Sequence, residues 1–243
     1  MLGWYDRLQG VTETRGSIRG GVPVHRWHNR CPPDSIRIPS SHQSSGQFAV
    51  TPRSNTVRII GGEHRGRRLR FVDQPGLRPT PDRVRETLFN WLGQDLTGRR
   101  CLDLFAGSGA LGFEAISRHA REVVMTDQSR EATGQLREFA KAIGTDRATI
   151  LQCDALEFLG AMGRQRSPEA LFDVVFLDPP FGADWIARIE PLLAPVLAER
   201  SLVYVEMESK YQPGAGLQIL KSGRAGAVHY ALAGQADASG ADQ

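Results

Sequence analysis

The stretch Val174–Phe181, with the sequence Val-Val-Phe-Leu-Asp-Pro-Pro-Phe, decides the fold of this chain. Its first four residues are apolar without polar alternation, which is typical of a strand in a parallel sheet that is covered on both faces. Two prolines then end the strand, because proline cannot donate a hydrogen bond to a neighbouring strand. Asp178, the Pro179 carbonyl and Phe181 are therefore predicted at the carboxyl end of a central strand, where open α/β sheets bind their ligands.

Strand and helix patterns alternate on both sides of this stretch. The predicted elements are strand 101–104, helix 110–118, strand 122–126, helix 130–143, strand 148–152, helix 155–162, strand 172–177, helix 184–197 and strand 202–206. Such alternation indicates an α/β, Rossmann-like fold with a doubly wound, mostly parallel sheet and right-handed crossovers. Segments 217–220 and 227–232 are predicted to add a C-terminal antiparallel hairpin.

The part of the chain before this core is predicted to be small and basic. Two short strands, 56–60 and 67–72, indicate a β-hairpin. A helix follows from Pro81 to about Leu96, with Thr80 as its expected N-cap. The first residues show weak apolar periodicity and many Gly, Pro and Ser, which is typical of a disordered segment. The predicted organisation is a mostly disordered leader (1–52), a basic hairpin and helix (53–98), a core (99–233) and a flexible tail (234–243).

The composition is that of an ordinary soluble globular protein, with 40% hydrophobic and 23% charged residues. No apolar run approaches the ~20 residues that a membrane-spanning helix needs, and no secretory signal is recognisable. Cys31, Cys101 and Cys153 are an odd, scattered set without a Cys-x-x-Cys pair, so neither a disulfide framework nor a zinc site is indicated. We expect a protein of the reducing cytoplasm.

Positive charge is concentrated in one short segment. Residues 53–85 hold nine arginines against three acidic residues, whereas residues 86–243 hold 15 basic and 21 acidic residues. Arginine suits bidentate contact with phosphate, and a concentrated basic block is typical of a nucleic-acid contact. A solvated basic surface without a partner is the alternative.

The stretch Leu102–Gly112 has the pattern of a strand, a glycine turn and a helix start. Alone, this pattern fits a turn without ligand, or a dinucleotide site with an acidic residue about 20 residues further on. Three acidic residues at predicted strand ends favour another ligand. Asp103 would face the ammonium group of a methionine moiety, Asp127 would accept two ribose hydroxyls, and Asp154 would accept an adenine amino group. This set predicts S-adenosylmethionine, which carries a sulfonium and no phosphate.

The sequence Asp-Pro-Pro-Phe can serve an exocyclic amino group, which is a poor nucleophile because its lone pair is delocalised into the base. The Asp178 carboxylate and the Pro179 carbonyl can accept its hydrogens and free the lone pair for in-line attack on the sulfonium methyl. Phe181 offers a ring for stacking the base, worth about 1–3 kcal/mol. We expect neither a metal nor a covalent intermediate. This chemistry leaves guanine N2, adenine N6 and cytosine N4 open, in RNA or DNA.

Three stretches together resemble the RsmD family of bacterial 16S ribosomal RNA guanine-N2 methyltransferases: Gly76–Leu92, Leu102–Gly112 and Asp178–Phe181. The resemblance covers about residues 57–232. It implies a class I methyltransferase fold, S-adenosylmethionine as cofactor, and guanine 966 of 16S rRNA as the target. The implied partner is 16S rRNA in the small ribosomal subunit or its assembly intermediate. We expect a monomer without membrane contact.

Three sets of site residues are therefore predicted. The catalytic set is Asp178, Pro179, Pro180 and Phe181. The cofactor-binding set is Asp103, Phe105, Ala106, Gly107, Gly109, Asp127, Gln128, Asp154 and Ala155. The RNA-binding set is Arg65, Arg67, Arg68, Arg78, Arg83 and Arg85. The alternatives from other functional classes are a dinucleotide-dependent oxidoreductase at the glycine turn and a non-catalytic RNA-binding module on residues 53–85.

Overall fold

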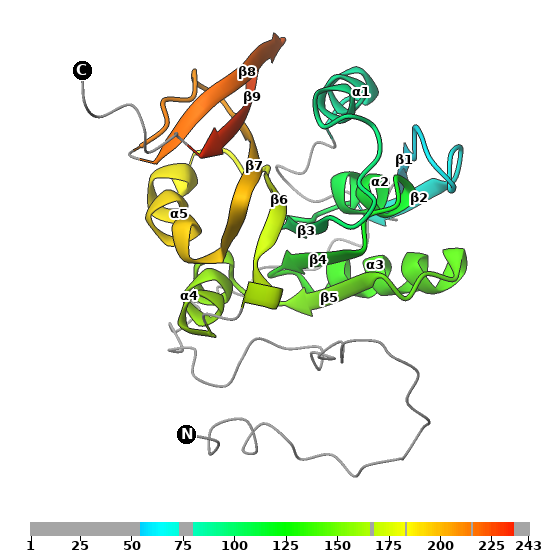
Figure 1. Ribbon diagram of the computed structural model, residues 1–243. Helices are drawn as coiled ribbons and strands as arrows, with labels where there is room; N and C mark the ends of the chain where they lie inside the picture. Colours follow the sequence, from blue (N-terminus) through cyan, green and yellow to red (C-terminus); the bar gives the residue numbers. More distant parts are fainter. Residues whose placement is uncertain (1–53, 73–79, 166–167, 183, 215, 236–243) are drawn as a thin grey trace, which may run out of the picture.

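The computed structural model describes residues 54–72, 80–165, 168–182, 184–214 and 216–235 (Figure 1). The predicted leader, the last eight residues and Arg78 lie outside these ranges. The elements in chain order are β1 (Ser54–Arg58), β2 (Arg68–Val72), α1 (Asp82–Trp91), β3 (Arg100–Asp103), α2 (Ala110–Ser117), β4 (Glu122–Asp127), α3 (Arg130–Ile143), β5 (Ala148–Gln152), α4 (Ala155–Gln165), η2 (Pro168–Ala170), β6 (Phe172–Leu177), α5 (Trp185–Leu193), η3 (Ala194–Val196), β7 (Leu197–Met207), β8 (Leu217–Ala225) and β9 (Val228–Gln235).

Seven strands form one sheet in the order β5-β4-β3-β6-β7-β9-β8. The five strands from β5 to β7 in this order are parallel, while β9 is antiparallel to both β7 and β8. The predicted doubly wound, mostly parallel sheet with a C-terminal hairpin is confirmed. From β3 the chain adds strands first on one side of the sheet (β4, β5) and then on the other (β6, β7). The carboxyl ends of β3 and β6 therefore form the topological switch point, where α/β sheets bind ligands.

Helices cover both faces of the sheet (Figure 1). Successive strand residues face opposite layers, since side chains alternate along a strand. Cys101 and Val174 pack with α1, α2 and α3 on one face, and Leu102 and Val175 pack with α4 and α5 on the other. This two-sided burial is why the strands read as continuous apolar runs in the sequence.

The N-terminal hairpin is part of the same core. Strands β1 and β2 pair antiparallel as predicted, with Val57 opposite Leu69. Both side chains are buried in the apolar cluster that also contains Leu88 of α1 and Phe113 of α2. The basic segment is therefore fixed to the α2 side of the sheet through apolar contacts.

Two helices end earlier than predicted. α1 ends at Trp91 and not near Leu96, because Gly93 and Gln94 adopt φ angles of 92° and 65°, outside the helical region. α5 ends at Leu193, and β7 already starts at Leu197. Leucines at helical spacing continue beyond both helix ends, so the sequence pattern did not indicate where α1 and α5 end. Within the described residues, no helix is long and apolar enough to span a bilayer.

Candidate active site

Four acidic residues lie in a row at one edge of the sheet, each at or just beyond the carboxyl end of its strand. Asp127 ends β4, Asp103 ends β3, Asp178 follows β6, and Glu206 lies next to the last residue of β7. The strand order β4-β3-β6-β7 makes these residues neighbours in space. The first three were predicted from the sequence, and Glu206 was not.

The glycine turn between β3 and α2 has the predicted tight geometry. Gly107 and Gly109 adopt φ angles of 48° and 76°, in the left-handed region that favours glycine. A Cβ atom on Gly109 would lie 2.5 Å from Leu136 and 2.7 Å from Phe113. Glycine is therefore required at position 109 both by its backbone angle and by the packing of α2 against α3.

Asp103 and Asp127 hold this turn through its backbone. Asp103 accepts a hydrogen bond from the Gly112 N–H at 2.9 Å, and Asp127 accepts one from the Gly107 N–H at 2.9 Å and one from the Ser129 N–H at 2.7 Å. Burial raises the pKa of Asp103 to about 7, and it also raises the pKa of Asp127 against the effect of its hydrogen bonds. A cationic ligand group beside these carboxyls would favour their ionised forms.

Asp154 lies where the sequence placed it, but it also has a structural task. Its Oδ1 accepts the backbone N–H groups of Leu156 and Glu157, which makes Asp154 the cap of helix α4. Its Oδ2 accepts a hydrogen bond from the Gln128 amide at 2.7 Å. Oδ1 therefore caps the helix, while Oδ2 accepts a hydrogen bond from the exposed side chain of Gln128. A ligand amino group could replace that side chain. Ala155 is the buried first residue of α4.

The predicted catalytic residues follow β6 as a rigid turn. Pro179 is buried and Pro180 is exposed. The ring of Phe181 is 50% exposed, which makes it one of three large exposed apolar side chains among the described residues. Phe105 of the glycine turn packs edge-on against Trp185 of α5, with ring centroids 5.4 Å apart. This contact ties the predicted cofactor turn to the helix that follows the Asp-Pro-Pro-Phe turn.

The prediction that Thr80 caps α1 is wrong. Pro81 occupies the N-cap position, and no side chain caps the helix there. The Thr80 hydroxyl instead donates a hydrogen bond to Asp178 Oδ2 at 3.1 Å, across 98 positions of sequence. Because Thr80 is buried, this bond fixes one oxygen of Asp178 and leaves the other to a ligand.

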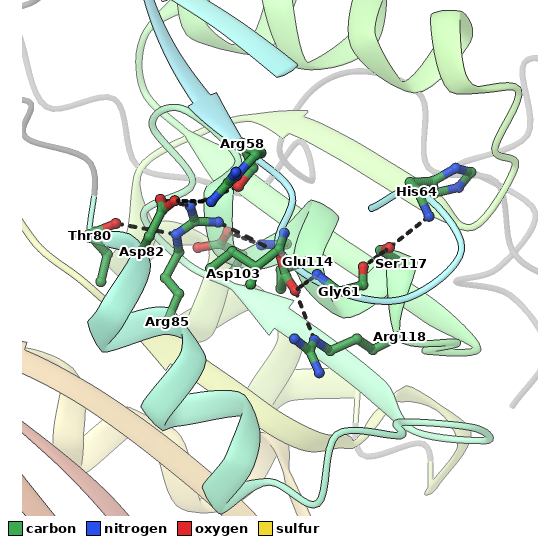
Figure 2. A network of polar contacts seen from close by, with 12 residues as sticks. Arg58, Gly61, His64, Thr80, Asp82, Arg85, Asp103, Glu114, Ser117 and Arg118 are labelled. Carbon is green, nitrogen blue, oxygen red and sulfur yellow. Dashed lines mark hydrogen bonds and ion pairs between the residues drawn. The ribbon is translucent and has the colours of Figure 1, made fainter. Parts of the chain in front are cut away.

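The prediction that Arg85 contacts RNA is also wrong, because this side chain is completely buried. Figure 2 shows Arg85 and Arg118 at the carboxylate of Glu114, an equally buried residue of α2. The same carboxylate accepts the backbone N–H groups of Ile60 and Gly61 at 2.7 and 2.8 Å. Buried charges need such partners, since ionised groups are costly to remove from water. Glu114 thereby fixes the end of the basic hairpin to α2.

Arg85 also contacts Thr80, Asp82 and Arg58 (Figure 2). Its Nε donates to the Thr80 carbonyl at 3.2 Å, and its Nη2 donates to the Arg58 carbonyl at 2.8 Å and to Asp82 at 2.6 Å. Arg85 therefore joins the hairpin to Thr80, whose hydroxyl holds Asp178. It is a positioning residue inside the fold.

The other predicted RNA-binding arginines that the structure describes are exposed. These are Arg65, Arg67, Arg68 and Arg83. Arg65, Arg67 and Arg68 come from the turn and second strand of the hairpin, and Arg83 from the first turn of α1. None of these four forms an ion pair among the described residues, so all four remain available for phosphate groups.

Sequence reasoning missed Thr80 and Glu206. Glu206 could have been found, because it ends the apolar run Val203–Val205 in the same way as Asp103 and Asp178 end theirs. No local pattern could have assigned Thr80, since its partner lies in a distant part of the chain. As a set, these side chains offer fixed acceptors beside a glycine turn and an exposed aromatic ring.

Comparison with known proteins identifies related chains. A family model described as "Conserved hypothetical protein 95" matches residues 57–234. Ribosomal RNA small subunit methyltransferase D of Escherichia coli (strain K12) is 41% identical over 170 residues, which cover 69% of this chain and 78% of that protein. The protein of the same name from Haemophilus influenzae is 40% identical over 183 residues, covering 72% and 92%.

A solved structure confirms the architecture. The structure of the protein yhhF from Escherichia coli has a TM-score of 0.66 and 39% sequence identity. The match covers 74% of this chain and 98% of that one.

Proposed function

This chain belongs to the RsmD family of ribosomal RNA small subunit methyltransferases, and on that basis we propose that it transfers a methyl group from S-adenosylmethionine to the exocyclic N2 of a guanine in 16S rRNA. The resemblance to the family implies guanine 966 as that position. The observation that carries the proposal is the placement of Asp178. Asp178 follows β6 at the switch point, three positions before the exposed Phe181, and one oxygen of its carboxyl group is held by Thr80.

The residues at the sheet edge fit S-adenosylmethionine. When bound, this cofactor supplies an activated methyl group on a sulfonium. Gly107 and Gly109 let the backbone approach the ligand, and Asp103 offers a buried carboxylate to its ammonium group. Asp127 can exchange its bond to the Gly107 N–H for ribose hydroxyls, and Asp154 Oδ2 can accept the adenine amino group. The remaining members of the proposed cofactor set are Phe105, Ala106, Gln128 and Ala155.

The Asp-Pro-Pro-Phe turn would orient the target base. Phe181 stacks on the base, while the free oxygen of Asp178 and the Pro179 carbonyl accept the two amino hydrogens. These acceptors would localise the lone pair on the nitrogen. That lone pair would form the new N–C bond, and the electron pair of the broken C–S bond would stay with sulfur. The nitrogen then releases one proton. Position and electrostatics account for the catalysis, as fixed acceptors stabilise charge that develops on the nitrogen.

Methyl transfer in vitro tests the proposed function directly. The purified chain is incubated with labelled S-adenosylmethionine and small ribosomal subunits from a strain that lacks this modification. Mass spectrometry of the digested RNA is expected to show one new N2-methylguanine. Methylation of an adenine or cytosine amino group would instead establish the alternative base specificity. No incorporation, with heat released on binding NADH and none on binding S-adenosylmethionine, would favour the oxidoreductase alternative.

Exchanging the exposed hairpin arginines tests the RNA surface. Replacing Arg65, Arg67 and Arg68 by alanine is expected to weaken binding to a 16S rRNA fragment. It should also lower the slope of log affinity against log salt by about 2, since each lost contact with a single strand accounts for about 0.7. Fluorescence titration between low and physiological salt measures both quantities.

The matched control replaces Arg121 and Arg200, which are exposed and lie near the amino ends of β4 and β7, at the opposite edge of the sheet. This variant is expected to keep the slope of the unaltered protein. A slope that stays the same in both variants would mean that the hairpin does not contact the RNA backbone.

A further inference from the structure

We propose that Glu206 is a positioning residue whose carboxylate, opposite Asp178 in the sheet, makes Asp178 the proton acceptor for the methylated amine. This proposal rests on the proposed function and assigns a role within the same site. The proton is the one that the nitrogen releases after the N–C bond has formed and the C–S bond has broken. It passes to the free oxygen of Asp178 and from there to water.

The register of the sheet sets the two carboxyl groups side by side. Leu177 of β6 pairs with Val205 of β7 in parallel. Asp178 and Glu206 are the next residues along these two strands, so their side chains leave the same face of the sheet. Thr80 completes the arrangement, because its hydroxyl donates to Asp178 Oδ2 at 3.1 Å.

Within the part of the chain that the structure describes, the pair has no positive partner. Glu206 is only 4% exposed, and Asp178, although partly exposed as a residue, has its carboxyl among buried side chains. Among the described residues, no lysine, arginine or histidine forms an ion pair with either group. Two buried carboxylates that lie close together repel each other when both are ionised, so the charge of one raises the pKa of the other.

Burial raises the pKa of Glu206, and the Tyr204 hydroxyl, which donates to Glu206 Oε1 at 2.8 Å, counters this by favouring the ionised form of Glu206. Burial, followed by the charge of Glu206, raises the pKa of Asp178 well above its usual range. The other titratable group that acts on Asp178 is Asp103, while Tyr230 acts on Tyr204, and neither of the two brings positive charge. A carboxylate with a raised pKa is a stronger base, which suits a group that must take a proton from an amine.

The test is Glu206→Gln, which keeps the size and the hydrogen bonds of the side chain and removes its charge. Without that charge, the pKa of Asp178 falls. The acidic limb of kcat against pH is expected to move to lower pH by about one unit or more. A residue with a merely structural role would lower kcat or stability at every pH without moving this limb.

Two further variants serve as comparisons for Glu206→Gln: one should shift the acidic limb in the opposite direction, and the other should not shift it. Thr80→Val removes the hydrogen bond to the ionised carboxylate of Asp178, so it should move the limb to higher pH. Glu190→Gln is the matched control, because Glu190 accepts the hydroxyl of Tyr211 at 3.0 Å in the same way but is not among the groups that affect Asp178. This variant should leave the limb in place.

Carbon-13 NMR of the side-chain carboxyls gives a readout that needs no activity. In the substrate-free protein, Glu206→Gln is expected to lower the pKa of Asp178. An unchanged pKa, or a changed pKa without a shift of the kcat limb, overturns the proposal. A lowered pKa in a protein that methylates no RNA at all would instead refute the proposed function and leave the coupling of the two carboxyls established.

Discussion

Asp178→Ala is expected to lower kcat for methyl transfer at least about 1,000-fold, while the affinity for S-adenosylmethionine changes little. The loss is large because the variant removes both an acceptor for the amino hydrogens and the proposed proton acceptor, and effects of this kind each reach about 100-fold or more. Binding is retained because the proposed cofactor contacts come from β3, β4 and the residues after β5. Single-turnover kinetics and calorimetry measure the two quantities separately.

Asp178→Asn refines this experiment. Its amide oxygen can still accept a hydrogen bond from the Thr80 hydroxyl. Its NH₂ group then faces the amino group of the target, and because both groups are donors, no hydrogen bond can form between them. The variant is therefore expected to be strongly impaired without loss of stability. The control is Asp146→Ala, at an exposed position between α3 and β5. Activity close to that of the unaltered protein in Asp178→Ala would refute the proposed mechanism.

Glu114→Ala is expected to lower the free energy of unfolding by about 3–5 kcal/mol. Removing one partner of a buried ion pair leaves the other charge uncompensated. Here the variant removes a carboxylate that two guanidinium groups share. The fully buried Arg85 keeps Asp82 as an ion-pair partner, while Arg118, whose side chain is 7% exposed, has no other ion pair among the described residues. It also removes the acceptor for the N–H groups of Ile60 and Gly61. Urea unfolding followed by circular dichroism measures the change.

The comparison variant is Glu138→Ala, which removes an exposed glutamate from helix α3 and should change stability by less than about 0.5 kcal/mol. Glu114→Gln should lie between the two, because it keeps acceptor oxygen but loses the charge. If Glu114→Ala were as stable as Glu138→Ala, the buried cluster would not anchor the hairpin.

Some parts of the fold were readable from local sequence alone. The helix predicted at 130–143 has the same bounds in the structure, because Ser129 caps its first turn and Gly144 ends it in the left-handed conformation. Strand 172–177 is likewise as predicted, since its apolar run stops at Asp178 and the prolines. Both cases depend on residues next to each other in the chain, where steric and hydrogen-bonding rules act directly.

The distinction between Arg83 and Arg85 was not readable in this way. Both belong to the same basic block and lie two positions apart on one helix, yet Arg83 is exposed and Arg85 is buried. The difference arises from Glu114, which lies on another helix and provides the charge that lets a guanidinium leave water. The amino-acid composition of the basic segment cannot distinguish the two arginines, because it contains no information on a partner such as Glu114.

The sequence by itself determined the α/β sheet, the glycine turn and the position of Asp178 at the end of a central strand, because apolar periodicity, glycine angles and proline geometry act over a few residues. Only the tertiary structure placed Thr80 and Glu206 at Asp178 and turned Arg85 into the link between the hairpin and this site. Those contacts join residues as far as 98 positions apart, and they depend on which strands become neighbours and which charges are buried together.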